Sequence, residues 1–65
     1  MDSEKIAKKL IDLRGKRSRE EVAKVLGISV SALSMYENGA RIPRDETKKK
    51  ISIYYGESVE DIFFN

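Results

Sequence analysis

Apolar residues recur three and four positions apart along this chain, which is the spacing of one face of a helix. The first such stretch runs from Ile6 to Leu13 and follows Ser3, a residue type favoured as a helix N-cap. Gly15 comes soon after the stretch and supplies a C-terminal stop. The pattern therefore predicts a helix over residues 3–14.

Two shorter helices are predicted next, over residues 18–26 and 29–37, and a serine begins each of them. Ser18 and Glu21 have the spacing of a capping box, in which each side chain accepts a hydrogen bond from the other residue's backbone. Gly27 is expected between the helices because a left-handed residue turns the chain sharply there. The inward positions of this pair are expected at Val22, Ala23, Leu26, Leu33 and Tyr36.

The rest of the chain predicts two further helices and no sheet. Pro43 pushes the residue before it out of the helical region, so a fourth helix is expected from Arg44 to Tyr55, with its lysine-rich first half exposed. Ser58 then caps a last short helix. The inward positions of these helices are Ile51, Tyr54, Tyr55, Val59, Ile62 and Phe63. No segment alternates with a period of two, so the predicted fold class is all-α with five helices.

The composition narrows the chemistry that the protein can perform. A chain of 65 residues has room for one domain, so residues 1–65 are expected to fold as a unit. The sequence has no cysteine and no histidine, which removes disulfides, thiolate metal sites and the usual general base. No Asp-rich loop has the spacing of a calcium site. We therefore expect no metal or other cofactor, and an enzyme is the weakest interpretation.

Charge is distributed unevenly, although 13 basic and 11 acidic residues leave a formal net charge of only +2. The chain has basic clusters at Lys16, Arg17 and Arg19 and at Arg41, Arg44, Lys48, Lys49 and Lys50, and acidic residues at Glu57, Glu60 and Asp61. This uneven distribution of charge is stronger evidence for a charged partner than the net charge is. No apolar run approaches the roughly 18 residues of a membrane span, and the first residues do not begin a signal peptide, so a cytoplasmic protein is expected.

Several short motifs follow one another in a recognisable order. They are Ser18-Arg19-Glu20-Glu21-Val22-Ala23, Leu26-Gly27-Ile28-Ser29, Leu33-Ser34, Tyr36-Glu37-Asn38-Gly39 and Arg41-Ile42-Pro43, followed by Gly56, Ser58, Val59 and Ile62. Together they resemble the phage-repressor, Cro and Xre-type helix-turn-helix family over nearly the whole chain. The resemblance implies a compact five-helix lambda-repressor-like domain, with its helix-turn-helix at about residues 18–37, that binds operator DNA as a dimer.

The chain departs from the family pattern at two places. Arg19 stands where the family most often has glutamine, and arginine adds charge and a planar fork of donors, so DNA affinity is expected to be more salt-sensitive. The connection between the first two helices is also shorter than usual. We still match Arg14 to the arginine that ends the family's first helix. The resemblance then implies a partly buried ion pair between Arg14 and Glu37.

The resemblance also implies which residues hold DNA phosphates. Arg19, Asn38 and Arg41 correspond to phosphate-clamping positions. Arg44 and Lys48 are expected to join them from the exposed start of the fourth helix. For Asn38 the alternative is a turn cap, because Asn-Gly often closes a helix, and we expect both roles together.

Base reading is expected on the outer face of the third helix, at Val30, Ser31, Ser34 and Met35. Serine hydroxyls contact several base edges, whereas Val30 and Met35 offer no conventional donor and suit the methyl group of thymine. The alternative is that Val30 and Met35 pack in the core. Val30 is the less certain of the two because its helical phase opposes that of Leu33 only partly.

Phe63 and Phe64 are consecutive, so one helix cannot bury both against a small core, and we expect them at a dimer interface. The sequence thus favours a repressor that binds a palindromic operator as a homodimer. Because no sensor domain is present in 65 residues, control is expected through abundance, proteolysis or a separately encoded protein partner. A protein-binding module, such as the antitoxin partner of a toxin, stays open as the alternative, although the chain has no spare segment to neutralise a toxin.

Overall fold

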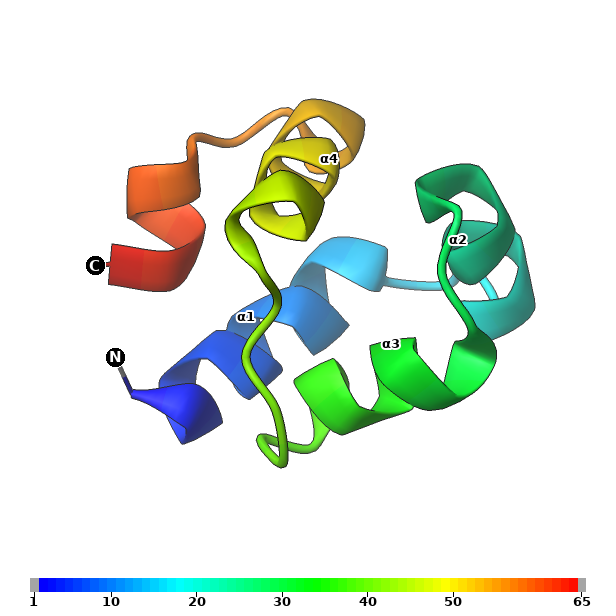
Figure 1. Cartoon of the computed structure of the whole chain (residues 1–65), viewed down its shortest axis with the longest axis horizontal. Helices are drawn as coiled ribbons and strands as arrows, with labels where there is room; N and C mark the ends of the chain where they lie inside the picture. Colours follow the sequence, from blue (N-terminus) through cyan, green and yellow to red (C-terminus); the bar gives the residue numbers. More distant parts are fainter. Residues whose placement is uncertain (1, 65) are drawn as a thin grey trace.

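The computed structural model describes residues 2–64, and these form five helices and no strand (Figure 1). The helices are α1 (Ser3–Arg14), α2 (Arg19–Leu26), α3 (Val30–Glu37), α4 (Asp45–Tyr55) and the π-helix η1 (Glu60–Phe64). The predicted all-α class with five helices is confirmed. The predicted boundaries differ from these by one or two residues at most, as helix ends commonly do.

The core lies among all five helices. α1 contacts α3 and η1, while α2 contacts α3 and α4. The core side chains, each at most 6% exposed, are Ile6, Leu10, Val22, Ala23, Leu26, Leu33, Tyr36, Ile51, Ile62 and Phe63. Because α3 packs against α1 and α2 with one face, its opposite face is left at the surface.

Serine side chains cap three helical segments as the sequence predicts. Ser18, Ser29 and Ser58 each accept, through Oγ, a hydrogen bond of 3.0 Å from the backbone N–H three residues later. The first helix differs, because its N-cap is Asp2 and not Ser3. Asp2 Oδ1 accepts hydrogen bonds of 3.1 Å from the N–H groups two and three residues later. Its carboxylate also interacts favourably with the positive end of the helix dipole, which a hydroxyl does not.

Arg17 holds the short connection between α1 and α2. Gly15 ends α1 with a φ of 58°, a conformation that glycine adopts without steric cost. Arg17 then folds back, so that its Nε donates to the Arg14 carbonyl at 3.2 Å and its Nη2 donates to the preceding carbonyl at 2.7 Å. Its guanidinium also lies 5.1 and 5.2 Å from the ring centroids of Tyr54 and Tyr55. This one side chain therefore donates hydrogen bonds to two carbonyls at the end of α1 and connects that end to α4.

Within residues 2–64, none of the helices has the length and apolar character needed to cross a membrane. The same residues contain no group of three or more carboxylate, histidine or cysteine side chains placed to hold a metal ion.

Candidate nucleic-acid interface

The outward face of α3 carries the four side chains predicted to contact bases. Val30 is 39% exposed and Ser31 is exposed, whereas Ser34 and Met35 are half-buried. Leu33 points into the core and is 1% exposed. Neither Val30 nor Met35 is a buried core residue, so all four side chains reach the surface. Their contact with bases stays a prediction.

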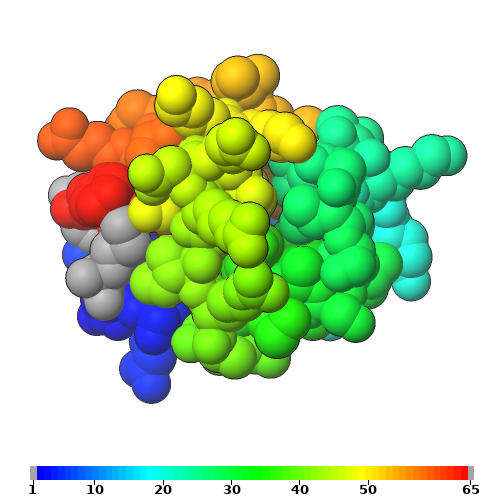
Figure 2. All heavy atoms as spheres, in the orientation of Figure 1, coloured from blue at the N-terminus to red at the C-terminus, as the bar shows by residue number. Residues whose placement is uncertain are grey.

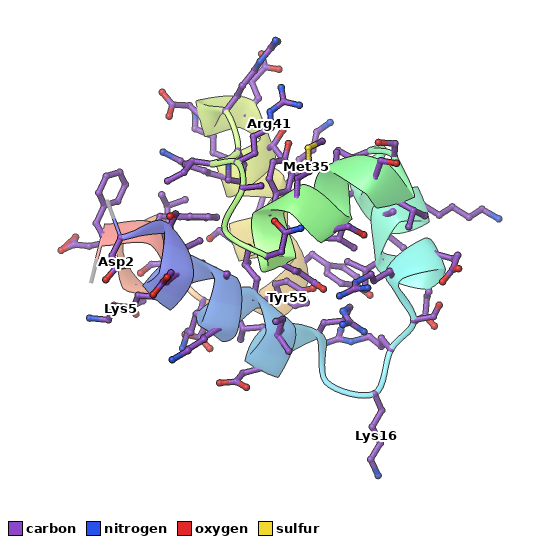
Figure 3. The ribbon with its side chains drawn as sticks, turned by 90° about the horizontal axis from the view of Figure 1, so that it is seen from below. Asp2, Lys5, Lys16, Met35, Arg41 and Tyr55 are labelled. Carbon is purple, nitrogen blue, oxygen red and sulfur yellow. The ribbon has the colours of Figure 1, made fainter. Side chains whose placement is uncertain are left out.

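The outer face of α3 and the segment that follows it lie side by side. In Figure 2 the atoms of α3 and of residues 38–44 occupy the front of the space-filling view. Figure 3 shows Met35 and Arg41 projecting from the same side of the bundle, while Lys16 points away on the opposite side. Lys16, although part of the first basic cluster of the sequence, therefore does not belong to the surface that α3 presents.

Three of the predicted phosphate ligands come from the segment that ends and follows α3. Asn38, Arg41 and Arg44 all have exposed side chains. Asn38 is the C-cap of α3, and its Oδ1 accepts a hydrogen bond of 2.9 Å from the Ala40 N–H, which leaves its amide nitrogen to donate outward. Arg44 is the N-cap residue of α4 and makes no side-chain capping bond. The connection from the end of α3 to the start of α4 therefore offers exposed hydrogen-bond donors.

Lys48 is buried, so the expectation that it lies on the exposed start of α4 is wrong. Its side chain is only 8% exposed, with Nζ 3.6 Å from Asp45 Oδ1. The ammonium lies 5.7 Å from the ring centroid of Phe63 and 5.1 Å from that of Phe64. The reason is helical phase, because Lys48 lies one turn before the buried Ile51 and so on the inner side of α4. A buried lysine in this position does not belong to a phosphate-binding surface.

The ends of three helices meet at the carboxylate of Glu37, and we call this cluster the arginine–glutamate junction. The Glu37 side chain is 0% exposed. Arg14, from the end of α1, donates from Nε to Glu37 Oε2 at 2.8 Å and from Nη1 to the Arg17 carbonyl at 2.8 Å. Arg19, from the start of α2, donates from Nε to Glu37 Oε1 at 2.9 Å. The structure thus brings Arg14 and Glu37 together and adds a second arginine.

The electrostatics of the junction follow from its position. Glu37 lies in the last turn of α3, where the helix dipole is negative, so its carboxylate needs nearby cations. The hydrogen bond to Glu37 raises the pKa of Arg14. Burial raises the pKa of Tyr55, and the Glu37 charge raises it further. The Tyr55 hydroxyl is buried without a hydrogen-bond partner among the described residues.

The contact between Arg19 and Glu37 is the part of the site that sequence reasoning missed. Arg19 was expected to contact phosphate alone, and 18 residues separate it from Glu37. The available signal was the arginine that stands at the start of α2 in place of the family's glutamine. It was to be considered together with the expected ion pair between Arg14 and Glu37. Only the way in which α2 and α3 pack shows that the two side chains meet.

The two C-terminal phenylalanines have different environments. Phe63 is 2% exposed and belongs to the core, so its assignment to a dimer interface is wrong. Phe64 is 60% exposed. The expectation that one helix cannot bury both rings therefore agrees with the structure, and only Phe64 is available to a second molecule.

Comparison with protein families gives a match to the helix-turn-helix family over residues 6–62. Comparisons with curated proteins and with solved structures gave no match. The family match extends from the first core residue of α1 into η1, so it includes the helix-turn-helix pair, the arginine–glutamate junction and the segment after α3. The chain belongs to the Cro-type, Xre-like helix-turn-helix family of DNA-binding transcription regulators.

Proposed function

We propose that two copies of this chain bind a palindromic operator, with α3 of each copy in a major groove, and that binding represses transcription. The observation that carries the proposal is the outward face of α3, with exposed donors at Asn38, Arg41 and Arg44 in the segment that ends and follows the helix. In helix-turn-helix proteins, donors of this kind fix the register on phosphates while the second helix contacts base edges. Each copy would then read one half-site.

Selection of bound sites from random duplex DNA tests this proposal directly. We expect the selected sequences to be palindromic, with half-site centres about 34 Å apart, which is one turn of the duplex. Arg41→Ala is expected to weaken binding to selected and random DNA by similar factors, whereas Lys16→Ala on the opposite side should leave both unchanged (Figure 3). Recovery of no enriched duplex would remove the proposed function.

Base discrimination is proposed to depend in part on thymine methyl groups. Val30 and Met35 can make favourable contacts only with an apolar group in the major groove. The thymine C5-methyl is the apolar group that DNA presents there. Replacing the thymines of the selected site by uracil removes that methyl and keeps every hydrogen-bonding edge. We expect a loss of about 1 kcal/mol of binding free energy for each contacted methyl. Unchanged affinity on uracil DNA would leave Ser31, Ser34 or DNA shape as the source of specificity.

Dimer formation is proposed to use the exposed ring of Phe64. A large apolar side chain that is 60% exposed at the end of the chain is suited to contact a second copy. Sedimentation of Phe64→Glu is expected to show a smaller species than the wild type at the same concentration. Ile53→Glu is the matched control, because Ile53 is 82% exposed on α4 and outside this surface. A wild type that stays monomeric while it saturates a palindromic site would contradict the proposal.

Repression is the remaining part of the proposal. A dimer bound across a promoter occupies the DNA that the polymerase needs. We therefore expect transcription in vitro from a promoter that overlaps the selected site to fall as protein is added. Arg41→Ala should require more protein for the same effect. An increase in transcript would instead assign the protein to activators.

A further inference from the structure

We propose that Glu37 is a positioning residue for DNA binding, which holds the Arg19 guanidinium so that its two terminal nitrogens point to a DNA phosphate. The inference rests on the proposed function and names how one contact of that function is prepared. Its basis is the hydrogen bond of 2.9 Å from Arg19 Nε to Glu37 Oε1. That bond uses one nitrogen of the guanidinium and leaves the other two without a partner among the described residues.

The geometry of the guanidinium decides what the remaining nitrogens can do. The group is planar and presents its N–H donors in a fixed fork, so holding Nε also fixes the plane of Nη1 and Nη2. The Arg19 side chain is 44% exposed although its Nε meets a fully buried carboxylate. The edge of the guanidinium that carries Nη1 and Nη2 is therefore at the surface. Two parallel N–H donors match the spacing of two phosphate oxygens.

Glu37 is itself fixed, which is what allows it to position another side chain. Its second oxygen accepts a hydrogen bond of 2.8 Å from Arg14 Nε. Arg14 is held in turn by the Arg17 carbonyl, to which its Nη1 donates at 2.8 Å. The carboxylate therefore has one orientation before any DNA arrives. Less side-chain entropy is then lost when Arg19 binds a phosphate.

The charges of the junction also favour an anion. One carboxylate is shared by two arginines, so the three side chains together keep one positive charge. Arg14 is the less accessible of the two, with 16% of its side chain exposed against 44% for Arg19. The excess charge is therefore offered to solvent mainly through Arg19. A phosphate binding there would complete the cluster as a neutral group.

The test uses the duplex selected for the wild type and measures affinity over a range of salt. Arg19→Lys keeps the charge and loses the fork, so we expect about tenfold weaker binding per half-site with an unchanged salt slope. Glu37→Gln, assayed on the folded fraction, should weaken binding similarly. In an Arg19→Ala background the same Glu37→Gln change should alter affinity less than twofold, because its effect passes through Arg19. Arg41→Lys, at an exposed arginine outside the junction, is the matched control and should cost less than Arg19→Lys.

Three outcomes overturn the inference. An Arg19→Lys variant that binds within twofold of the wild type would show that the paired guanidinium donors do not contact a phosphate. Glu37→Gln that weakens binding equally in both backgrounds shows a structural role alone. If Glu37→Gln does not fold, the NMR signal of the Arg19 Nε–H decides in the wild type, because it should stay protected from exchange when the duplex is added, and its loss contradicts the proposal. A wild type that binds no duplex at all removes the proposed function itself, whereas normal wild-type binding with an unchanged Arg19→Lys removes only this inference.

Discussion

Two charged side chains are buried among the described residues, and the protein holds them in different ways. Glu37 is 3% exposed and Lys48 is 6% exposed. Both carboxylate oxygens of Glu37 accept hydrogen bonds from arginines of other helices, at 2.8 and 2.9 Å. The Lys48 ammonium lies over two aromatic rings and 3.6 Å from Asp45, whose own side chain is 95% exposed. Two arginines of other helices therefore bond the buried carboxylate directly, whereas the buried ammonium has two aromatic rings and an exposed carboxylate beside it.

The difference shows what each buried charge requires of its surroundings. A carboxylate is compact, so the whole group loses its water and needs directed donors in return. A lysine has a long aliphatic stem that packs like an apolar residue and brings its charge close to the surface. Ring faces attract that charge without a fixed hydrogen-bond geometry. The Glu37 site should therefore tolerate substitution less than the Lys48 site does.

The largest expected effect is the loss of the Glu37 charge. Glu37→Gln leaves the half-buried Arg14 without its counterion, and we expect the free energy of unfolding to fall by about 3 kcal/mol. Urea unfolding measures this loss. Glu57→Gln is the control, because Glu57 pairs with Lys9 at 2.9 Å where both side chains are partly exposed to solvent, and this change should cost much less. A loss below about 1 kcal/mol for Glu37→Gln, the range of an exposed ion pair, would contradict the distinction between the two buried charges.

A smaller loss is expected when the charge of Lys48 is removed. Lys48→Met keeps a long flexible stem against the C-terminal rings and removes the attraction between the ammonium and the ring faces. We expect the free energy of unfolding to fall by about 1.5 kcal/mol. Lys49→Met, at the exposed neighbouring position, is the control and should change it little. A loss for Lys48→Met as large as that for Glu37→Gln would contradict the distinction between the two sites.

The two sites also differ in how far the sequence predicts them. The motif that surrounds Glu37 resembles a known family, so its pairing with Arg14 follows from the sequence alone. The contact of Arg19 with Glu37 was not predicted, because it depends on how α2 and α3 pack together. The prediction that Lys48 is exposed follows from the apolar positions of the fourth helix, which lie late in it and leave its lysine-rich first half without an apparent inner face. The position of Lys48 one helical turn before Ile51 is the sequence feature that indicates burial.

The fold itself was more predictable than the site, for a physical reason. Apolar spacing and capping serines are local features, and they place the helices to within one or two residues. Which of two adjacent rings becomes buried is not local. Phe63 and Phe64 are alike in sequence, and the direction in which η1 packs on α1 decides between them. The same holds for every side chain whose role depends on a neighbour from another helix.

The smallest expected change is a gain in stability, and it sharpens the view of the junction. The Tyr55 hydroxyl is buried without a partner, so it has lost its water and gained no hydrogen bond within the described chain. Tyr55→Phe removes that cost and keeps the ring beside Arg17. We expect the free energy of unfolding at neutral pH to rise by about 1 kcal/mol. Tyr54→Phe, on the adjacent half-buried ring, is the control and should give no such gain.

The pH dependence of unfolding gives the same substitution a second and independent measure. Burial, and after it the charge of Glu37, raises the pKa of Tyr55 in the folded protein. Above about pH 10 the unfolded chain therefore ionises this tyrosine first, and the wild type loses stability as pH rises through the folded pKa. Tyr55→Phe has no proton to lose, so its stability should fall less steeply over that range. Parallel curves for the two proteins would show that folding does not raise the pKa of Tyr55. A loss of stability at neutral pH for Tyr55→Phe would show that the hydroxyl is hydrogen-bonded in solution and that Tyr55 supports the junction instead of weakening it.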